Sequence, residues 1–480
     1  MTAAAFASYL GRIMEIELKR LNKLFFSGIA GSGMSALAQV LNQGGRKISG
    51  SDRKFDRGES SALAQKLSTQ GIRIVPQDGS GVTAELDAVV VSTAVEQDTP
   101  DYRKAGALGV TVIPRPALLA ALVNSHRGVC FAGTSGKSSA TAIAAFVLNE
   151  LGFSPNVITG APLVDYLDGP TTGNALKGTS ELYCVEACES DGSVVDYRPA
   201  VGTILNIQRD HHEISDLLPM FTSFAAACRE TLIINADCPN TSSIKLPGKP
   251  EIVRFGIESE KAGVRAAGIS LGPFSASFRV GNSRLKSPLP GKYNVYNVLA
   301  ALAACEAVGV NREDFARLLP AFRGTARRFQ KVGEEKGVVV IDDFAHNPDK
   351  IAAVLASLEN WPGLRRRIVV FQPHGYSPTR FYFEDLVKTF TGALKPDDLL
   401  VLPEIYYAGG TVARDISSRD LADRVVSAGR SAVYFERRSD AAPAIAGAAG
   451  EGDLVLVMGA RDDTLTDFCY QVLGAIKARF

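Results

Sequence analysis

The sequence has no long uninterrupted apolar run and no excess of charge of one sign. Its 480 residues include 52 basic and 51 acidic side chains, so the net charge of +1 gives no reason to expect binding to nucleic acid or a membrane surface. The first 24 residues start apolar, but charged side chains interrupt them (Arg12, Glu15, Glu17, Lys19 and Arg20). We therefore predict neither a signal peptide nor a membrane span, and treat residues 1–23 as an extension.

Cysteine is scarce and is not arranged as a metal or disulfide framework. The seven cysteines are an odd number, none forms a C-x-x-C pair, and most lie in apolar runs. This pattern predicts buried thiols in a reducing compartment, and hence a cytoplasmic protein. No low-complexity tract or internal repeat is present. The length and the 46% hydrophobic content predict a globular protein of two to four domains.

A glycine turn between a strand and a helix is the most informative motif. Residues 129–132 predict a strand, Gly133-Thr134-Ser135-Gly136-Lys137-Ser138 a turn, and the alanine-rich residues 139–151 a helix. In such a turn backbone N–H groups face an anion, Lys137 reaches terminal phosphates and Ser138 ligates Mg²⁺. The motif therefore predicts a nucleoside triphosphate ligand, and an ordinary strand-to-helix turn is the alternative. Phe131 stands where the longer form of the motif has glycine.

A second glycine turn lies near the N-terminus. After a strand that begins at Leu24, Gly31-Ser32-Gly33-Met34-Ser35-Ala36 fits G-x-G-x-x-A before a helix, and Asp52 closes the next strand at 47–50. Strands at 87–92 and 111–113 alternate with helices at 60–70 and 115–122, which predicts a parallel, Rossmann-like sheet. The turn favours a phosphate-bearing ligand, and a plain turn with a surface Asp is the alternative.

Polar side chains follow most of the later strand candidates. Apolar runs at 181–185, 201–207 and 231–234 are followed by acids, an amide or a histidine, among them Glu186, Glu189, Asn206 and His211. Because ligands bind beyond the carboxyl ends of parallel strands, these side chains are expected to converge on the phosphate loop as a metal-phosphate site. Residues 255–287 predict a short antiparallel addition and 298–308 a helix. Strands at 338–341, 368–371 and 454–457 predict a third α/β unit.

The order of these motifs resembles the Mur ligases of peptidoglycan synthesis, most closely the branch that adds alanine. The resemblance runs from about residue 24 onward, and each block alone is weak. Ten blocks carry it in family order: Gly28 to Ser35, Ser49 to Asp52, Val91 to Ala94, Gly133 to Ser138, Glu189 to Asp191, Asn206 with Asp210-His211, Gly291 to Asn294 with Asn297, Arg327 to Phe329, Asp342 to Pro348, and Phe371 to His374.

The resemblance implies an ATP-dependent ligase that joins UDP-N-acetylmuramate to L-alanine. A substrate carboxylate attacks the γ-phosphate of ATP to give an acyl phosphate, and an amine then displaces phosphate through a tetrahedral intermediate. Because one anion meets another, the site needs Lys137 and Mg²⁺. Three α/β domains are implied: a Rossmann-like domain for the UDP-sugar at 1–126, a central P-loop ATP-binding domain with a mostly parallel sheet at 127–325, and a Rossmann-like C-terminal domain for the amino acid and for closing on ATP at 326–480.

Carried over residue by residue, the resemblance assigns roles to individual side chains. Lys137, Glu189 and His211 would be catalytic, with Thr134, Ser138 and Glu189 around one Mg²⁺ and His211 at a second. The other ATP contacts would be Gly133, Ser135, Gly136, Ser139, Asn294, Asn297, Arg328, Asp343 and His346. The UDP-sugar contacts would be Gly31, Ser32, Gly33, Met34, Asp52, Ser92, Thr93 and Arg115. His374 and Arg380 would serve the acceptor amino acid.

Each of these side chains also has an ordinary structural interpretation. A histidine at a strand end such as His211 commonly serves as a local hydrogen-bonding residue. Asn294 is equally suited to cap a helix N-terminus. Arg328, Asp343 and His346 are each open to explanation as members of surface ion pairs, which contribute little.

Two departures from the family pattern bear on the reaction. Residues 213–244 contain no lysine, which excludes the carbamylated lysine of several Mur ligases and agrees with the alanine-adding branch. Gly375 and Pro378 replace two arginines of the alanine-adding pattern, and neither can clamp a carboxylate. Either Arg380 substitutes for those arginines, or the incoming amine is a different amino acid or a whole peptide, as in the recycling ligases.

Two functions of other classes compete with this interpretation. The first is a nicotinamide-dependent oxidoreductase with an accessory ATPase domain. The second is a non-catalytic sensor of nucleotide-sugars, which would be expected to have lost Lys137, Glu189 or His211, and the chain retains all three. The sequence makes no prediction of oligomeric state.

Overall fold

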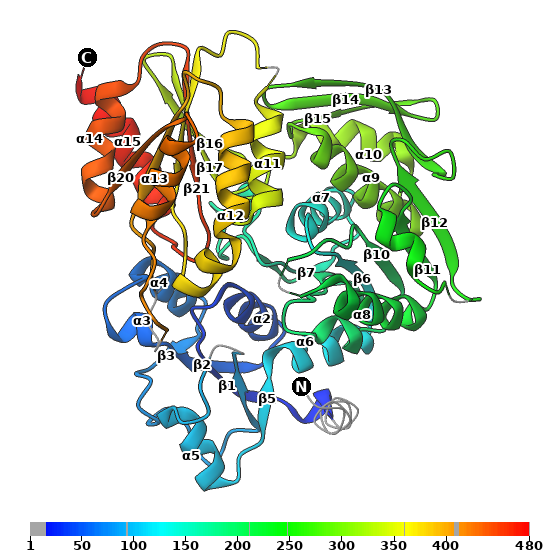
Figure 1. The fold of residues 1–480 in the computed structure, drawn as a ribbon. Coiled ribbons are helices and arrows are strands. Elements are labelled where there is room, and N and C mark those ends of the chain that lie inside the picture. The colour runs from blue at the N-terminus through cyan, green and yellow to red at the C-terminus, as the bar shows by residue number, and fades with distance from the viewer. Residues whose placement is uncertain are drawn as a thin grey trace. The chain divides into compact units, whose positions relative to one another are not determined.

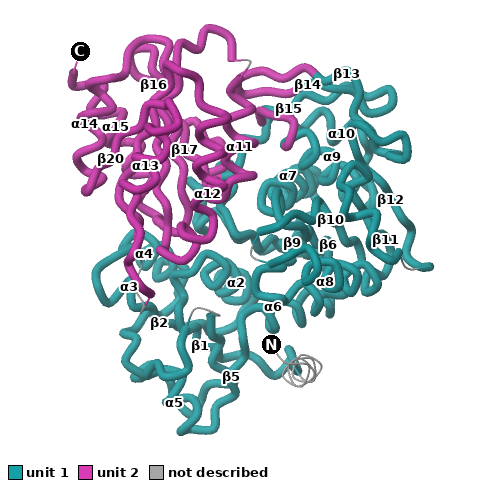
Figure 2. Tube along the Cα trace, in the orientation of Figure 1, with its two compact units in different colours: residues 1–269, 277–288, 294–325 teal, residues 270–276, 289–293, 326–480 magenta. Residues whose placement is uncertain are grey.

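The structure is a computed structural model that describes residues 16–92, 95–210, 212–246, 248–359, 361–407 and 412–479. These residues form two compact units, coloured separately in Figure 2. Unit 1 consists of Met1–Ile269, Ser277–Pro288 and Asn294–Thr325, and unit 2 of Ser270–Ala276, Leu289–Tyr293 and Ala326–Phe480. The predicted boundary near residue 126 lies inside unit 1, and the one near 325 coincides with the start of the main segment of unit 2.

The N-terminal part of unit 1 is a five-stranded parallel sheet with the order β3-β2-β1-β4-β5. Its apolar strands are buried on both faces, as expected where helices cover a parallel sheet. The chain runs through η1 (Leu18–Arg20), β1 (Lys23–Ser27), α2 (Ser32–Gln43), β2 (Lys47–Ser51), α3 (Arg53–Asp56), α4 (Ser61–Thr69), β3 (Arg73–Ile74), β4 (Ala88–Val91), α5 (Pro100–Leu108), β5 (Val112–Pro114) and α6 (Arg115–Asn124) (Figure 1). The strand order reverses between β1 and β4, and such a switch point is where ligands bind in open α/β sheets.

The remainder of unit 1 carries most of a ten-stranded sheet with the order β15-β14-β13-β12-β11-β10-β6-β9-β7-β8. Its elements are β6 (Arg127–Ala132), α7 (Lys137–Glu150), β7 (Asn156–Ile158), η2 (Val164–Tyr166), β8 (Ala175–Leu176), β9 (Leu182–Glu186), η3 (Ser193–Asp196), β10 (Val201–Ile204), α8 (Ile214–Ala227), β11 (Thr231–Asn235), η4 (Pro239–Ser243), β12 (Glu251–Gly256), β13 (Val264–Gly272), β14 (Ser275–Val280), β15 (Ser283–Ser287), α9 (Lys292–Ala307), α10 (Arg312–Leu318) and η5 (Leu319–Ala321). Two-residue connections join β13, β14 and β15, which only antiparallel neighbours permit, so the predicted antiparallel addition is confirmed.

Unit 2 contains a six-stranded sheet with the order β16-β17-β21-β18-β19-β20. Only β16 is antiparallel to its neighbour among the pairs of this sheet. Its elements are β16 (Gln330–Glu335), β17 (Val338–Asp343), α11 (Pro348–Ser357), β18 (Arg366–Phe371), α12 (Tyr376–Ala393), β19 (Leu399–Pro403), α13 (Ser418–Ser427), β20 (Ser431–Phe435), α14 (Arg438–Ala448), β21 (Asp453–Met458) and α15 (Leu465–Arg479). Each of α11 and α13 has a local start signal, because the side chains of Asn347 and Ser417 accept backbone N–H groups of the first turn.

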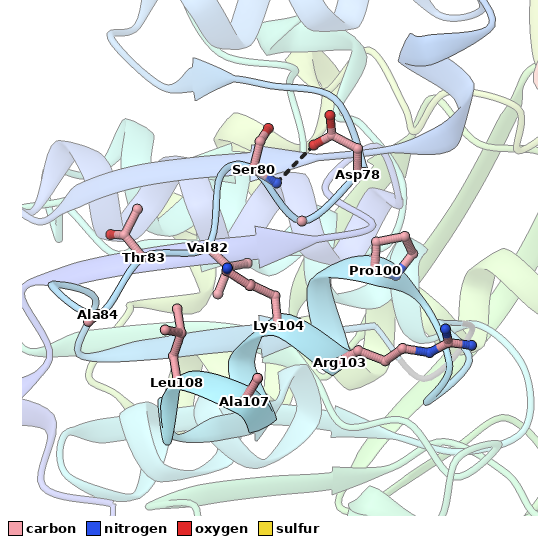
Figure 3. Close-up of a pocket in the computed structure, with 11 residues that line it drawn as sticks. Asp78, Ser80, Val82, Thr83, Ala84, Pro100, Arg103, Lys104, Ala107 and Leu108 are labelled. Carbon is pink, nitrogen blue, oxygen red and sulfur yellow. Dashed lines mark hydrogen bonds between the residues drawn. The ribbon is translucent and has the colours of Figure 1, made fainter.

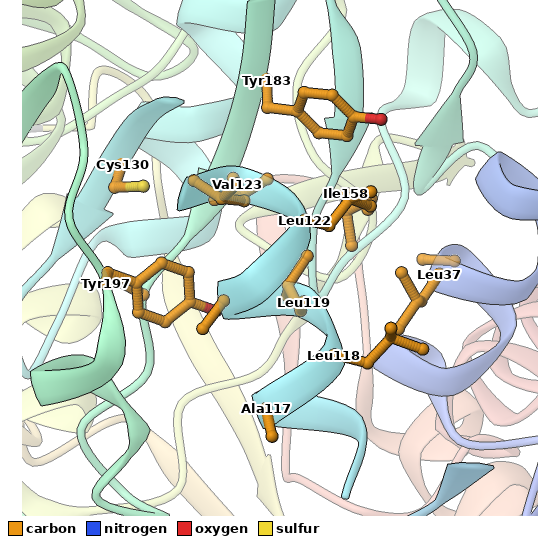
Figure 4. Close-up of a cluster of buried hydrophobic side chains, with 14 of the residues drawn as sticks. Leu37, Ala117, Leu118, Leu119, Leu122, Val123, Cys130, Ile158, Tyr183 and Tyr197 are labelled. Carbon is orange, nitrogen blue, oxygen red and sulfur yellow. The ribbon is translucent and has the colours of Figure 1, made fainter. Parts of the chain in front are cut away.

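One hydrophobic cluster joins the first two sheets of the chain. Figure 4 shows Leu118, Leu119 and Leu122 of α6 beside Leu37 of α2 and Ile158 of β7, all of them buried. This shared core explains why residues on both sides of position 126 form one compact unit. In unit 2, separate clusters lie on the two faces of the sheet. Six of the seven cysteines are buried, Cys188 is half-buried and none is in a disulfide, as the composition predicted.

The helix α9 begins six residues earlier than the predicted start at position 298. Asn, Tyr and Val are weak helix formers, so residues 293–297 carry little helical signal of their own. Tertiary packing stabilises the helix here, because Asn294, Val295 and Asn297 are buried. Asn294 therefore lies inside α9, and its alternative interpretation as a helix N-cap is wrong.

A buried ion pair anchors the sheet of unit 2. Arg367 and Asp398 are 2% and 1% exposed, and the backbone N–H of Arg367 also donates to Asp398 at 2.8 Å. We predict that Asp398→Asn lowers the stability of unit 2 by about 3–5 kcal/mol, because it leaves a buried guanidinium without its counter-charge. The urea midpoint is measured through Trp361, the sole tryptophan, which packs in this unit.

The matched control is Glu384→Gln, which breaks the pair of Glu384 with Arg424. Both side chains of that pair are about half exposed, at 60% and 49%, so no measurable change of midpoint is expected. Equal midpoints for the two variants would contradict the role assigned to the buried pair.

Candidate active site

The glycine turn after β6 adopts a backbone that only glycine tolerates well. Gly133 and Gly136 have φ values of 136° and 87°, and α7 begins directly after Gly136. The first N–H groups of α7 therefore have no partner within the helix and are available to an anion. Thr134, Ser138 and Ser139 are buried, so the loop is an integral part of the fold.

Asn206, two residues beyond β10, holds this loop in shape. Its Oδ1 accepts the hydroxyl of Thr134 at 2.8 Å and the backbone N–H of Ser135 at 2.9 Å, and its Nδ2 donates to the carbonyl of Ser135 at 3.0 Å. The Thr134 hydroxyl also accepts the N–H of Gln208 at 3.0 Å. Thr134 is thus engaged on both its donor and acceptor sides, and it shapes the loop.

Lys137 and Glu189 form a buried ion pair. Lys137 Nζ lies 2.7 Å from Glu189 Oε2 and 2.6 Å from the carbonyl of Gly133, and the two side chains are 14% and 2% exposed. Burial is the largest single influence and lowers the pKa of Lys137, but Glu189, with Cys188 and Glu186, raises it by more in total, so the pKa lies above its ordinary value. The ammonium is therefore fully charged and held beside the glycine turn.

Ser138 is paired with Glu186, one of the acids expected to converge on the phosphate loop, to which the family resemblance assigned no role. Its hydroxyl donates to Glu186 Oε2 at 3.0 Å, while Glu186 Oε1 accepts from the hydroxyl of Thr159 and the backbone N–H of Gly160. Glu186 ends β9, and the parallel register places it opposite Phe131 of β6. Its position at the end of the strand next to β6 is what brings it to the loop, as the sequence predicted. P-loop proteins carry a Mg²⁺-binding acid together with the P-loop hydroxyl.

Asn294 and Asn297 lie against the same loop. Asn297 Nδ2 donates to Asn294 Oδ1 at 3.0 Å, and both residues are buried, at 5% and 4% exposed. A Cβ added at Gly136 would overlap the side-chain oxygen of Asn297. The structure therefore brings both asparagines predicted for the adenine next to the predicted phosphate loop.

Two of the predicted side chains, His211 and Thr93, lie outside the described residues. Next to His211, Asp210 is buried, and the Nε2 atom of His212 lies 3.3 Å from the carbonyl of Ser190, which belongs to the turn that carries Glu189. Within the described residues no three His, Cys, Asp or Glu side chains cluster as a metal cage. A nucleotide-bound Mg²⁺ needs no such cage, because phosphates and water supply most of its ligands.

The N-terminal glycine turn has its own local scaffold. Gly31 precedes α2, so Ser32, Gly33 and Met34 form its first turn. Asp52 accepts the N–H of Ala30 at 2.9 Å with one oxygen and that of Lys54 at 2.9 Å with the other. Asp52 is buried, at 8% exposed, so the alternative of a surface Asp is wrong. Its carboxylate joins the end of β2 to the turn after β1.

Asp101 of α5 links the ends of β1 and β2 beside this turn, a role that the sequence interpretation did not predict. It is fully buried and accepts the hydroxyls of Ser27 at 2.8 Å and Ser51 at 2.5 Å, and the backbone N–H of Gly79 at 3.1 Å. Ser27 and Ser51 are the last residues of β1 and β2. No local motif connects a residue at position 101 with serines so far away along the chain, so tertiary structure alone reveals the contact.

Ser92 and Arg115 lie at the same edge of this sheet. In the strand register Ser27 lies opposite Val91 of β4, and Val91 lies opposite Pro114 of β5. Ser92 directly follows Val91, and Arg115 directly follows Pro114. Arg115 Nη2 lies 3.1 Å from Asp191 Oδ2, and a Cβ added at Gly33 would lie 3.4 Å from Arg115 Nη1. The guanidinium therefore lies against the glycine turn and is paired with an acid of the P-loop segment.

In unit 2, Asp343 ends β17 and binds backbone on both sides. Its two oxygens accept the N–H groups of Phe329 at 2.6 Å and Ala345 at 2.7 Å. Burial raises the pKa of Asp343 to about 6, against the lowering effect of Arg328 and of these two hydrogen bonds. The guanidinium of Arg328 lies 4.8 Å from the ring centre of Phe344. Asp343 is thus a buried structural carboxyl, and its alternative interpretation as a surface ion pair is wrong.

Two predicted histidines of unit 2 lie side by side. The rings of His346 and His374 have centres 5.4 Å apart, and His346 Nδ1 donates to the carbonyl of Phe344 at 2.8 Å. Gly375 has φ = 72°, and its N–H donates to the carbonyl of Tyr406 at 2.8 Å. Any side chain at position 375 would be strained in this conformation. The backbone at position 375 therefore favours glycine, which stands there in place of the arginine of the family pattern.

Arg380 is engaged in a surface ion pair. It donates to the carboxylate of Asp415 and to the carbonyl of Ala413, and the two charged side chains are 43% and 60% exposed. Arg380 would have to leave Asp415 to receive an acceptor carboxylate. Pro378 occupies the first turn of α12, where a missing N–H costs no hydrogen bond.

Figure 3 shows a cavity in the N-terminal part of unit 1. Its volume is about 770 Å³, and its lining comes from α5 and residues 78–84 of the first sheet segment. None of the side chains predicted to bind ligands lines it.

The comparisons with known proteins agree with this geometry. Family models match residues 23–127 (Mur ligase family, catalytic domain), 131–305 (Mur ligase middle domain) and 327–461 (Mur ligase, glutamate ligase domain). The chain is 33% identical over 463 residues to the UDP-N-acetylmuramate–L-alanine ligase of Caldanaerobacter subterraneus, a match that covers 93% of this chain and 96% of that one. The chain belongs to the Mur ligase family. It is also 35% identical over 471 residues to the protein of the same name from Streptomyces coelicolor, covering 95% and 98% of the two chains.

Solved structures confirm the Mur ligase fold. The UDP-N-acetylmuramate-alanine ligase of Thermotoga maritima matches with a TM-score of 0.78 and 24% identity, over 95% of this chain and all of that one. A murein peptide ligase from Psychrobacter arcticus matches with a TM-score of 0.67 and 21% identity, over 95% and 98%. The predicted fold class, family and ligase class are therefore confirmed. No helix among the described residues combines the length and apolarity that a membrane span requires.

The buried carboxyl of Asp196, which follows the Glu189–Asp191 turn in the chain, is expected to make the stability of the protein depend on pH. Asp196 is fully buried between α6 and α8, and neither of its carboxyl oxygens has a hydrogen-bond partner among the described residues. Burial, with a smaller contribution from the charge of Asp191, raises the pKa of Asp196 to about 7 against the opposing effect of Arg198. The folded chain thus binds this proton more tightly than the unfolded chain does.

Unfolding free energy is therefore expected to fall as pH rises from about 4 to about 7. Asp196→Asn should be more stable than the parent at pH 8 and should show a smaller change between pH 5 and pH 8. Thermal midpoints of both proteins across this range test the prediction. Asp98→Asn, at a 75% exposed position, is the control and should follow the parent. The same pH dependence in Asp196→Asn and the parent would contradict it.

Proposed function

We propose that this chain joins L-alanine to UDP-N-acetylmuramate at the expense of ATP, in the synthesis of peptidoglycan precursors. The observation that carries the proposal is the phosphate loop after β6, where Lys137 is held by Glu189 and Ser138 by Glu186. Curated relatives with 33–35% identity over more than nine-tenths of the chain support the choice of substrates through their names. The free, mostly buried cysteines support a cytoplasmic location.

The ATP phosphates would bind at the start of α7. The N–H groups of this turn and the Lys137 ammonium stabilise negative charge on the γ-phosphate while the substrate carboxylate attacks it. This step breaks the bond to the γ-phosphate, releases ADP and gives an acyl phosphate. Inorganic phosphate then leaves when the amine attacks the acyl carbon and gives up a proton. Asn294 and Asn297, adjacent to the loop at Gly136, offer amide donors and acceptors for the edge of the adenine.

Mg²⁺ would be held by the hydroxyl of Ser138 and the carboxylate of Glu186. Both are oxygen donors, which Mg²⁺ prefers, and they already lie 3.0 Å apart. When bound, the ion would neutralise charge on the ATP phosphates. Thr134, Glu189 and His211 remain predicted ligands from the family resemblance. In the structure Thr134 contacts Asn206, and Glu189 contacts Lys137 through one of its two carboxylate oxygens.

The UDP-sugar would bind at the switch point between β1 and β4. The turn from Gly31 to Met34, Ser92 and the guanidinium of Arg115 share this edge, and the N-terminal turn of α2 suits a diphosphate. We retain the division into a UDP-sugar domain at 1–126, an ATP domain at 127–325 and an amino-acid domain at 326–480. The roles of Arg328, Asp343 and His346 at ATP, of Thr93 at the UDP-sugar, and of His374 and Arg380 at the acceptor remain predictions.

A second candidate acceptor follows from unit 2. Gly375 and Pro378 provide no carboxylate clamp, and Arg380 is paired with Asp415, so a different amino acid or a peptide is the alternative amine. Phosphate release with UDP-N-acetylmuramate and a panel of amino acids and peptides tests both candidates. Release stimulated by L-alanine supports the first, and release stimulated only by a peptide supports the second. No stimulation by any acceptor contradicts both.

Lys137→Ala is predicted to abolish ATP-dependent product formation, because the γ-phosphate loses its nearest cation. Product is measured by chromatography with saturating ATP, and the fold by circular dichroism. Because the single variant leaves Glu189 buried without a counter-charge, Lys137→Ala with Glu189→Gln serves as a second test. Near parental turnover in a folded form of either variant would contradict the mechanism.

Glu186→Gln is predicted to raise the Mg²⁺ concentration that gives half-maximal activity by about tenfold or more. Glu189→Gln is predicted to change the KM for ATP while leaving the Mg²⁺ requirement near that of the parent, because Glu189 contacts Lys137. Titration of Mg²⁺ at fixed free ATP separates the two carboxylates. A larger shift in Glu189→Gln than in Glu186→Gln would instead favour Glu189 as the metal ligand.

A further inference from the structure

One short turn holds the basic side chains of both proposed anion sites. Glu189 pairs with Lys137 of the phosphate loop, and Asp191, two residues later, pairs with Arg115. The side chains of Arg115 and Asp191 are only 19% and 15% exposed, so this pair is much better shielded than an ordinary surface pair. All four residues belong to unit 1.

The carboxylate of Asp191 is itself fixed in orientation. Its Oδ1 accepts the backbone N–H of Ser193 at 3.0 Å and the Ser193 hydroxyl at 2.6 Å. Its Oδ2 is thereby left to face Arg115 Nη2 at 3.1 Å. Ser193 is buried and opens the helical turn η3, so this anchor is part of the scaffold.

The other side of the guanidinium lies against the N-terminal glycine turn. A Cβ added at Gly33 would lie 3.4 Å from Nη1 of Arg115, 3.5 Å from its Cδ and 3.6 Å from its Cζ. Gly33 is in the first turn of α2, where N–H groups without a partner in the helix attract an anion. Arg115 thus lies between a fixed carboxylate and a helix start suited to a diphosphate.

We propose that Asp191 is a positioning residue of the sugar-nucleotide site, which holds Arg115 against the Gly33 turn for the diphosphate of the UDP-sugar. The inference rests on the proposed function and extends it to a residue of the ATP-binding segment. Arginine has a long, flexible side chain, and holding it in place before the ligand arrives reduces the entropy lost on binding. Asp191 acts through Arg115 and does not touch the ligand.

Titration of the full chain with UDP, followed by calorimetry, tests the proposal. Asp191→Asn should weaken UDP binding about tenfold, as expected when a charged hydrogen bond becomes neutral, and a non-hydrolysable ATP analogue should bind with unchanged affinity. Arg115→Met should weaken UDP binding at least as much, and combining it with Asp191→Asn should cause no further loss. Asp191→Glu should restore part of the affinity, because it restores the charge.

Glu230→Gln is the matched control. It makes the same change of carboxylate to amide beside an arginine of unit 1, Arg127, in a pair whose side chains are 45% and 48% exposed. It should leave UDP binding unchanged. Parental UDP affinity in Asp191→Asn, or an equal loss of UDP and ATP-analogue binding, would overturn the inference. Losses that multiply in the double variant would also overturn it, while failure of the parent chain to bind UDP at all would overturn the proposed function itself.

Discussion

The parallel pairing of β6 with β9 and β10 is the constraint on which the candidate active site depends. It sets Phe131 opposite Glu186, and Ala132 opposite Ile204, so the segments that follow these three strands leave the sheet at one edge. The glycine turn, Glu186 and Asn206 meet there although Ser138 and Glu186 are 48 positions apart. The contacts of Asn206 with Thr134 and Ser135, and of Glu186 with Ser138, follow from this register.

The cations of the two proposed anion sites in unit 1 are each paired with a carboxylate. The chain as a whole is nearly neutral, so binding of anionic substrates has to come from local cations. The proposed cations of unit 1 are Lys137 and Arg115, and each is mostly buried beside a carboxylate of the turn from Glu189 to Asp191. A buried charge without a partner is costly, so the pairing stabilises both side chains and fixes their orientation.

Much of the fold could be predicted because its signals are local. Apolar runs ended by polar residues marked central strands in each of the three sheets, although β3, β7, β8, β16, β19 and β20 were not predicted. Two glycine turns marked the edges at which ligands are proposed to bind. The failures share a different cause. The early start of α9, the burial of Asp52 and Asp343, and the contacts of Asp101 all depend on neighbours that are distant in sequence. The role of Glu189 as a metal ligand follows from the family resemblance and stays a prediction; in the structure its partner is Lys137.

The sequence by itself determined the family, the order of the three α/β segments and the position of the phosphate loop, because glycine conformation, hydrophobic period and motif order are properties of the chain alone. Tertiary structure alone decided the partner of each charged group: Lys137 with Glu189, Ser138 with Glu186, Arg115 with Asp191 and Arg380 with Asp415. The physical reason is that hydrogen bonds and ion pairs act over a few ångströms, and only strand register and helix packing bring residues from separate segments within that distance.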